Sequence, residues 1–455
     1  MLRPSSTGTT WRAMAEGATV SRDRRQAFDR REFLRRSGRA GLLLPAAPAL
    51  LAACARPGTT VDPGAVGTGG LDLGGPYPIA TPEHPVTWTI FEDNPPIADG
   101  LRPEQGATLE IFIWDAYLWK KVVQDFCAAY DCDYRITTFT NMDEALAKVR
   151  TGELRFDVFF PTTDTFGKLI SSKLLQPLNR SYLPNLDTNV WPVYGSPYYD
   201  GESRYSVPYV VYSTGIGYRR DAIPDATFAD LANPYDILWD PTHAGRVGVY
   251  DSYRDTMGEV LLRRGITDVN TGRAEDLQLV EDDLLALTDA VGARTSTNGA
   301  FELLPQNQFD LHTAWSGDMI ASWFYVDPSS SYEDLGYWFP QDRRGLVGSD
   351  AITIPANAEH PVLAHRFLNH LLEPGAALKN FSWTGYQPPQ NDADPDSLTT
   401  TISPQGEPYV FPWMESAIVR PEDFDLGVGV QLTELTPEVD DRWHDVWQRF
   451  QLGVS

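Results

Sequence analysis

Residue types that carry out chemistry are plentiful in this chain, but none stands in the spacing of a catalytic motif. The 455 residues include 62 Asp and Glu, seven His and three Cys, without a nucleophile elbow, a zinc-protease helix or a phosphate-binding loop. His360, His365 and His370 are five residues apart, so on a helix each turns about 140° from the last and they cannot share a metal ion. We expect a non-enzymatic protein without cofactor or metal. Because two carboxylates that meet in a fold can cleave a glycosidic bond, a secreted hydrolase is the alternative from another class.

The net charge and the aromatic content favour a small cationic ligand and argue against nucleic acid as a partner. Asp and Glu outnumber Lys and Arg by 62 to 37, a net charge of −25, whereas nonspecific nucleic-acid binding requires the opposite sign. Aromatic residues make up 12% of the chain, with 13 Trp and 20 Tyr, and their flat faces can cover a sugar, a base or a cation. The acidity has a second explanation, adaptation to salt, which stays open.

The first 53 residues predict an export signal. The twin-arginine pair Arg30-Arg31 precedes a run of small and apolar residues from 40 to 53, which is too short to span a bilayer. Residues 51–54, Leu-Ala-Ala-Cys, resemble a bacterial lipobox, in which Cys54 is acylated and becomes the new N-terminus. We therefore expect a lipid-anchored protein on the outer face of the cytoplasmic membrane, at the cell surface or in the periplasm.

The two remaining cysteines predict a structural role. Four residues separate Cys127 from Cys132, which is not the CxxC redox spacing, and no second pair completes a zinc site. In an exported protein we expect a local disulfide between them at a helix-to-strand corner. Two free buried thiols are the alternative.

The order of the segments predicts an α/β fold with two lobes. Strand-like runs at 107–114, 132–139 and 156–160 alternate with helical runs, which favours a parallel sheet with crossover helices. A long extended run at 205–218 leads into a second series of the same kind. We expect the following divisions: a signal peptide at 1–53, a Gly/Pro-rich tether at 54–105, lobe 1 at 106–212 and 350–400, lobe 2 at 213–349, and a C-terminal helical segment at 401–455 packing across the lobes.

Several segments resemble the spermidine/putrescine-binding proteins of bacterial ABC importers. They are Ile113–Tyr117, Phe156–Thr162, Tyr205–Tyr218, Leu238–Asp255, Ala314–Asp318, Asp350–Ala358, Thr384–Pro388 and Trp443–Phe450. Each match is weak alone, but their shared order along nearly the whole mature chain argues against chance. The resemblance implies a type II periplasmic-binding fold, with a polyamine held between two lobes by a monomer that delivers it to permease subunits. A different small solute is the alternative within this class.

The resemblance also implies a set of cleft residues. It assigns aromatic walls to Trp114, Tyr117, Trp315 and Tyr386, ammonium-binding carboxylates to Asp255 and Asp350, and a hydroxyl near the cleft to Thr162. A buried ammonium needs acceptor oxygens and a compensating charge. Aromatic faces add cation–π attraction of about 0.5–2 kcal/mol each and cover the methylene spacer.

Four positions depart from the family pattern. Ser252 stands where the family has Asp, Asp255 where it has Glu, Asp164 where it has Tyr, and Gly348 where it has Trp. We include Ser252 and Asp164 among the candidate ligand-binding residues. Because one acid is lost and another gained, the charge is redistributed and the preferred amine stays open.

Overall fold

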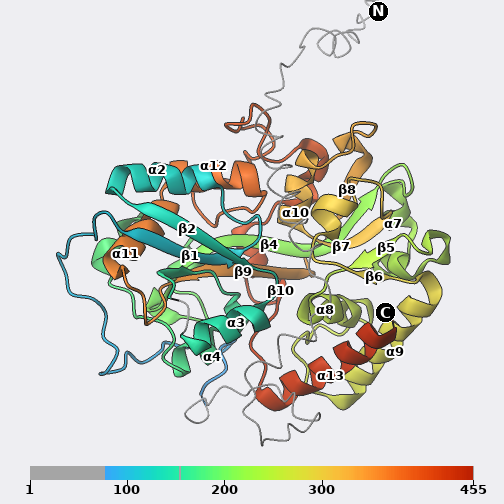
Figure 1. Cartoon of the computed structure of the whole chain (residues 1–455). Coiled ribbons are helices and arrows are strands. Elements are labelled where there is room, and N and C mark those ends of the chain that lie inside the picture. Colours follow the sequence, from blue (N-terminus) through green and yellow to red (C-terminus); the bar gives the residue numbers. More distant parts are fainter. Residues whose placement is uncertain (1–76, 153–154, 454–455) are drawn as a thin grey trace, which may run out of the picture. The chain divides into compact units, whose positions relative to one another are not determined.

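The computed structural model describes residues 77–152 and 155–453 (Figure 1). The predicted signal peptide, Cys54 and the first part of the predicted tether lie outside the described residues. None of the helices in the described ranges is long and apolar enough to cross a membrane.

A mixed sheet runs through the described part of the chain in the order β2-β1-β3-β9-β4-β7-β5-β6, with β10 beside β9 and β8 beside β4. The strands are β1 (Thr108–Trp114), β2 (Asp133–Phe139), β3 (Val158–Phe159), β4 (Ser206–Arg219), β5 (Val247–Val249), β6 (Arg294–Thr295), β7 (Leu311–Trp315), β8 (Leu335–Trp338), β9 (Leu346–Thr353) and β10 (Val430–Gln431). The β2-β1-β3 and β7-β5-β6 pairings are parallel. The strand–helix alternation of the sequence had predicted parallel pairing of this kind.

Strands β4 and β9 connect the two halves of the sheet. The first part of β4 pairs antiparallel with β9, from Ser206↔Thr353 to Thr214↔Leu346, and its last part pairs with β7 and β8. All but one of the 14 residues of β4 are buried, as expected for a β-branched and aromatic run covered on both faces. Side chains on these two strands therefore lie where the lobes meet.

Helices cover both faces of the sheet in each half (Figure 1). Those of lobe 1 are α2 (Lys120–Tyr130), α3 (Met142–Thr151), α4 (Phe166–Ser171), α5 (Pro184–Thr188), α6 (Pro192–Gly195), α11 (Pro361–Leu371) and α12 (Pro374–Thr384); those of lobe 2 are α7 (Ala226–Asp230), α8 (Tyr253–Arg263), α9 (Ala274–Val291) and α10 (Ser316–Ala321), with α13 (Pro437–Gly453) packed on α9. Helix α3 shows how single residues set the ends of a helix. The Asn141 side chain accepts from the Glu144 backbone at its start, and Gly152 ends it at φ +63°, because only glycine adopts that angle without strain.

The buried apolar residues form two clusters: one fills lobe 1 and extends into lobe 2, and the other lies in lobe 2. The first packs Phe112, Phe126 and Phe367 between the lobe 1 sheet and its helices. The second packs Leu284, Val280 and Trp443 in lobe 2, where Trp443 comes from α13. Two cores joined by two long strands fit a chain of this size better than one core would.

The N-terminal segment contacts lobe 1 from Tyr77 onward. Trp88 Nε1 donates to the carbonyl of Tyr199 at 2.8 Å, and Arg204 donates to the carbonyl of Trp88 at 2.7 Å. The Leu101 amide donates to the Tyr182 hydroxyl. The predicted tether, 54–105, thus differs from the structure over its second half, because a few anchoring side chains fix a segment whose composition is typical of a linker.

The C-terminal segment touches both lobes. Helix α13 packs on α9 and α8, and its Asp440 accepts from Lys168 of lobe 1 at 2.8 Å and from Tyr253 of lobe 2 at 2.7 Å. The Lys168–Asp440 ion pair is largely shielded from solvent. Residues far apart in sequence therefore hold the lobes against each other on this side.

Cys127 and Cys132 are free thiols in the structure, contrary to the expected disulfide and in line with its alternative. Asp131, directly after helix α2, adopts a left-handed conformation. The Cys127 thiol then donates to the carbonyl of Asp133 at 3.5 Å. Burial raises the pKa of the Cys127 thiol, so it is a poor source of the reactive thiolate.

Candidate functional site

The predicted site residues come from the carboxyl ends of parallel strands in both lobes. Trp114 ends β1, Thr162 follows β3 by three residues, Trp315 ends β7, and Ser252 and Asp255 follow β5 at the start of α8. Asp350 lies on β9, the strand that crosses between the lobes. In open α/β sheets, ligands bind outside the carboxyl ends of the strands, so the fold points these residues toward one shared region.

Asp350 is a buried carboxylate with half of its hydrogen-bonding capacity unused. Asp350 is 4% exposed to solvent, and its Oδ2 accepts from the Tyr117 hydroxyl at 2.7 Å. Oδ1 has no hydrogen-bond partner among the described residues. Burial, with smaller contributions from the charges of Asp164 and Asp255, raises the pKa of Asp350 to about 7, and the hydroxyls of Tyr117 and Tyr212 offset this rise only in part. A nearby cation would stabilise the charged form of this carboxyl group.

Asp255 is held in a fixed orientation by three donors. Oδ1 accepts from Thr214 Oγ1 at 3.0 Å and from Trp315 Nε1 at 2.9 Å, and Oδ2 accepts from Ser252 Oγ at 2.8 Å. Burial nevertheless raises the pKa of Asp255, with a contribution from the charge of Asp164. Ser252 therefore orients a buried carboxylate that has no paired cation among the described residues.

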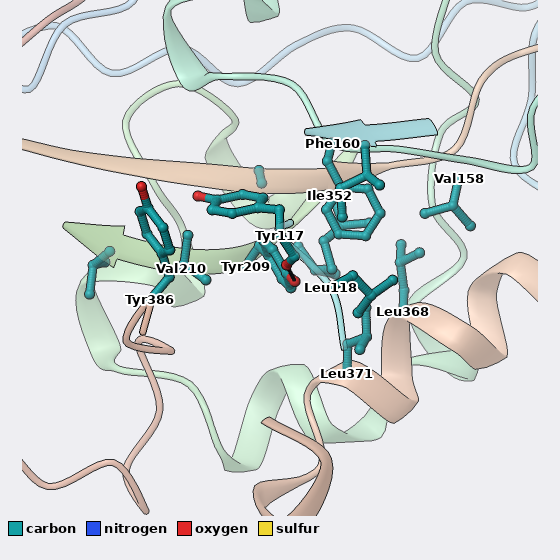
Figure 2. Packing of buried hydrophobic residues seen from close by; sticks show 14 of the residues in the cluster. Tyr117, Leu118, Val158, Phe160, Tyr209, Val210, Ile352, Leu368, Leu371 and Tyr386 are labelled. Atoms are coloured by element: carbon teal, nitrogen blue, oxygen red, sulfur yellow. Dashed lines mark hydrogen bonds between the residues drawn. The ribbon is translucent and has the colours of Figure 1, made fainter. Parts of the chain in front are cut away.

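Aromatic rings surround these carboxylates. Trp315 stacks on Tyr250 with ring centres 3.9 Å apart, and Tyr117 meets Tyr386 edge-on at 4.7 Å. Figure 2 shows Tyr117, Tyr209 and Tyr386 together at one end of the lobe 1 core. These rings can cover the apolar part of a ligand whose charged ends reach the carboxylates.

The Tyr386 hydroxyl is already engaged. It donates to Asp318 Oδ1 at 2.8 Å, and Tyr250 donates to Oδ2 of the same carboxylate at 2.6 Å. Gly317 makes this approach possible, because a β-carbon there would lie 2.5 Å from the Tyr386 ring. Tyr386 therefore offers its ring, rather than its hydroxyl, to the space beside Tyr117.

Asp164 faces the opposite lobe. It lies in a single turn, Thr163–Thr165, of lobe 1, and its Oδ2 is 3.7 Å from Arg254 of α8 in lobe 2. The Arg254 guanidinium also donates to the carbonyl of Thr433 and to Asn270. Part of the Asp164 charge is thus balanced across the lobes, while the rest acts on Asp255 and Asp350.

The structure joins most of the predicted site residues into two groups. One contains Tyr117, Asp350 and Tyr386, and the other contains Ser252, Asp255 and Trp315. Thr162 lies beside Asp350 through a backbone bridge. Trp114 instead contacts Phe139 of lobe 1, with ring centres 4.7 Å apart. The sequence analysis missed four residues that complete the two groups, namely Tyr212, Thr214, Tyr250 and Asp318.

Strand and helix periodicity could have found three of the missed residues. Thr214 and Tyr212 stand two residues apart on a predicted strand, and alternate residues share one face. Asp318 follows Trp315 by three residues, close to one helical turn. The contacts of Tyr250 and Tyr212 with Trp315 depend on sheet order, which the sequence does not contain.

Comparison with known proteins gives consistent matches. The family model for bacterial extracellular solute-binding proteins matches residues 121–403. The spermidine/putrescine-binding periplasmic protein of Salmonella typhimurium is 25% identical over 283 residues, covering 62% of this chain and 77% of its own. The putrescine/cadaverine-binding protein of Pseudomonas aeruginosa is 26% identical over 272 residues, covering 58% and 74%.

Solved structures share the fold at lower sequence identity. The spermidine/putrescine ABC transporter substrate-binding protein PotD from Streptococcus pneumoniae has a TM-score of 0.61 and 19% identity, covering 77% of this chain and 100% of that chain. The TpPotD lipoprotein of Treponema pallidum has a TM-score of 0.60 and 21% identity, covering 75% and 99%. The predicted two-lobed periplasmic-binding fold is confirmed.

Proposed function

Because this chain belongs to the family of bacterial extracellular solute-binding proteins, we propose that it captures a polyamine of the putrescine or spermidine class and delivers it to an ABC permease. The names of its relatives in Salmonella and Pseudomonas support this ligand class. The observation that carries the proposal is Asp350, a buried carboxylate with one unpartnered oxygen beside two further carboxylates and several aromatic rings.

A ligand with two ammonium groups fits the charges of the site. One ammonium would donate to the free Oδ1 of Asp350 and lower its pKa. The other would lie near Asp255, where Thr214, Trp315 and Ser252 already orient the carboxylate. The rings of Trp315 and Tyr386 would cover the methylene spacer. An anion would face three like charges, and a neutral sugar would leave them uncompensated.

Titration calorimetry tests this proposal directly. The mature chain, freed of ligand by partial unfolding and refolding, would be titrated with putrescine, spermidine, arginine, maltose and phosphate. We expect heat from the polyamines and none from maltose or phosphate. Heat from maltose with none from any polyamine would refute the proposal. Mass spectrometry of ligand that copurifies with the protein would identify a different solute if one is bound.

The export route belongs to the same proposal. Arg30-Arg31 and Cys54 lie outside the described residues, so the support is the sequence pattern alone. The Cys54→Ala protein, expressed in a bacterium with lipoprotein processing, should be released from the membrane fraction. Replacing both arginines with lysine should instead keep the chain in the cytoplasm. Membrane attachment as tight as that of the wild type after Cys54→Ala would contradict the lipid anchor.

A further inference from the structure

Tyr212 and Gly348 form a cross-strand pair in the middle of the site. They stand opposite each other on β4 and β9. A β-carbon placed on Gly348 would lie 2.8 Å from Cε2 and Cζ of Tyr212 and 2.9 Å from its hydroxyl oxygen. The outer half of the Tyr212 ring therefore lies over Gly348, and a side chain at position 348 would push it away.

The same strand ladder places Tyr212 between the two carboxylate groups. Going along β4, Val210 pairs with Asp350, Tyr212 with Gly348, and Thr214 with Leu346. Residues two apart on a strand point to the same face, and Thr214 donates to Asp255. Four residues of strand, about 13 Å at 3.3 Å per residue, thus separate the Asp350 end from the Asp255 end. Tyr212 lies at the midpoint.

The surroundings of Tyr212 fit a ligand lying along this ladder. Its ring is 6.2 Å from Trp315 and 6.1 Å from Tyr386, both edge-on. The charges of Asp350, Asp255 and Asp164 all act on its phenol. The ring forms a floor, and the two neighbouring aromatic residues form walls on either side.

We propose that Tyr212 determines specificity by selecting a linear diamine over a triamine. This inference rests on the proposed function. The terminal ammonium groups of a diamine reach the carboxylates at each end, and the ring beneath covers the apolar spacer. A triamine would place an internal ammonium over the ring, which offers no carboxylate, while the third carboxylate, Asp164, is paired with Arg254. A desolvated ammonium without acceptor oxygens is costly, and cation–π attraction offsets that cost only in part.

Substitutions at position 212 separate the ring from the hydroxyl. Tyr212→Ala removes the floor and admits water, which would hydrate an internal ammonium. We expect putrescine affinity to fall about tenfold and spermidine affinity to fall less, so that the ratio of the two dissociation constants changes at least fivefold. Tyr212→Phe keeps the ring but removes a hydroxyl that favours the charged form of Asp350, so it should weaken the binding of both amines alike and leave their ratio within twofold of the wild type.

Gly348→Ala completes a double-mutant cycle. In the wild type it should displace the Tyr212 ring and lower putrescine affinity about tenfold. In the Tyr212→Ala background there is no ring to displace, so the added effect should be less than twofold. Equal effects in both backgrounds would overturn the inference, and so would an unchanged ratio in a folded Tyr212→Ala protein. If Tyr212→Ala does not fold, unchanged affinities in Gly348→Ala would overturn it.

The wild-type titration distinguishes the two levels of the argument. If the wild type binds no polyamine, the proposed function has failed. If the wild type binds polyamines but its preference does not depend on Tyr212, only the present inference has failed.

Discussion

Replacing Asp350 with asparagine would show whether this carboxylate binds the ligand or stabilises the fold. Asparagine keeps the shape, and its carbonyl oxygen can still accept from Tyr117 at the position of Oδ2. Its amide group then occupies the place of Oδ1, which has no partner among the described residues. The substitution therefore removes a charge with little loss of packing or hydrogen bonding in the empty protein.

The stability of the empty protein should depend on pH through Asp350. The folded-state pKa is about 7, raised by burial from the ordinary value of 3.8. Between those values the folded protein binds more protons than the unfolded chain, so stability falls as pH rises through this window and levels off above it. At 1.36 kcal/mol for each unit of pKa, the whole loss is on the order of 4 kcal/mol.

Asp350→Asn should remove the loss of stability at high pH and weaken the binding of putrescine. At pH 8 the empty variant should melt several degrees above the wild type, and at pH 4 the two should melt together. Breaking a buried charge pair with the ligand costs about 2–5 kcal/mol, so putrescine affinity should fall roughly 30-fold or more. Calorimetry at pH 7 should also detect proton release on binding to the wild type, since an ammonium favours the charged carboxylate.

Asp200→Asn supplies a control for this experiment. Asp200 is also buried, but its oxygens accept from the Tyr205 amide and the Ser206 hydroxyl, away from the cleft residues. This variant should change the melting temperature without changing affinity. If Asp350→Asn lowers the melting temperature at every pH and leaves affinity intact, Asp350 is a structural group and the reasoning is wrong.

Three further outcomes follow from the hydrogen bonds and thiols described above. Trp315→Phe removes one donor to Asp255, so putrescine affinity, measured by calorimetry, should fall about tenfold. Tyr386→Phe removes a donor to Asp318 but keeps the ring, so the melting temperature should fall by a few degrees while affinity stays within threefold. A reducing agent should leave the melting temperature unchanged, because Cys127 and Cys132 are not bridged; a clear decrease would favour the disulfide instead.

Local patterns in the sequence are enough for the parts of the fold that depend on neighbours in the chain. The Asn141 cap and Gly152 set the ends of α3, because both act within one helical turn. The extended run around β4 was also predicted. Its pairing of Tyr212 with Gly348 was not, because register depends on a strand more than a hundred residues later.

The contacts of single side chains determine local structure that composition and spacing do not predict. Residues 77–105 contain six prolines and one glycine, a proline content typical of a linker, yet Trp88 anchors them to lobe 1. The spacing of Cys127 and Cys132 allows a disulfide, but the structure has two free thiols, and that of Cys127 donates to the carbonyl of Asp133. The sequence placed Tyr386 near the site, whereas only the structure commits its hydroxyl to Asp318.

The burial of the cleft carboxylates bears on why this chain is so acidic. Adaptation to salt places carboxylates on the surface, where water and ions solvate them. Some other buried acids are neutralised by neighbouring cations; Asp283, for example, accepts from Arg263 and pairs with Arg264. Asp350 and Asp255 are buried with raised pKa values and without a paired cation among the described residues. Surface acidity does not account for such groups, and the loss of stability they cause in the empty protein is offset when a cationic ligand occupies the site.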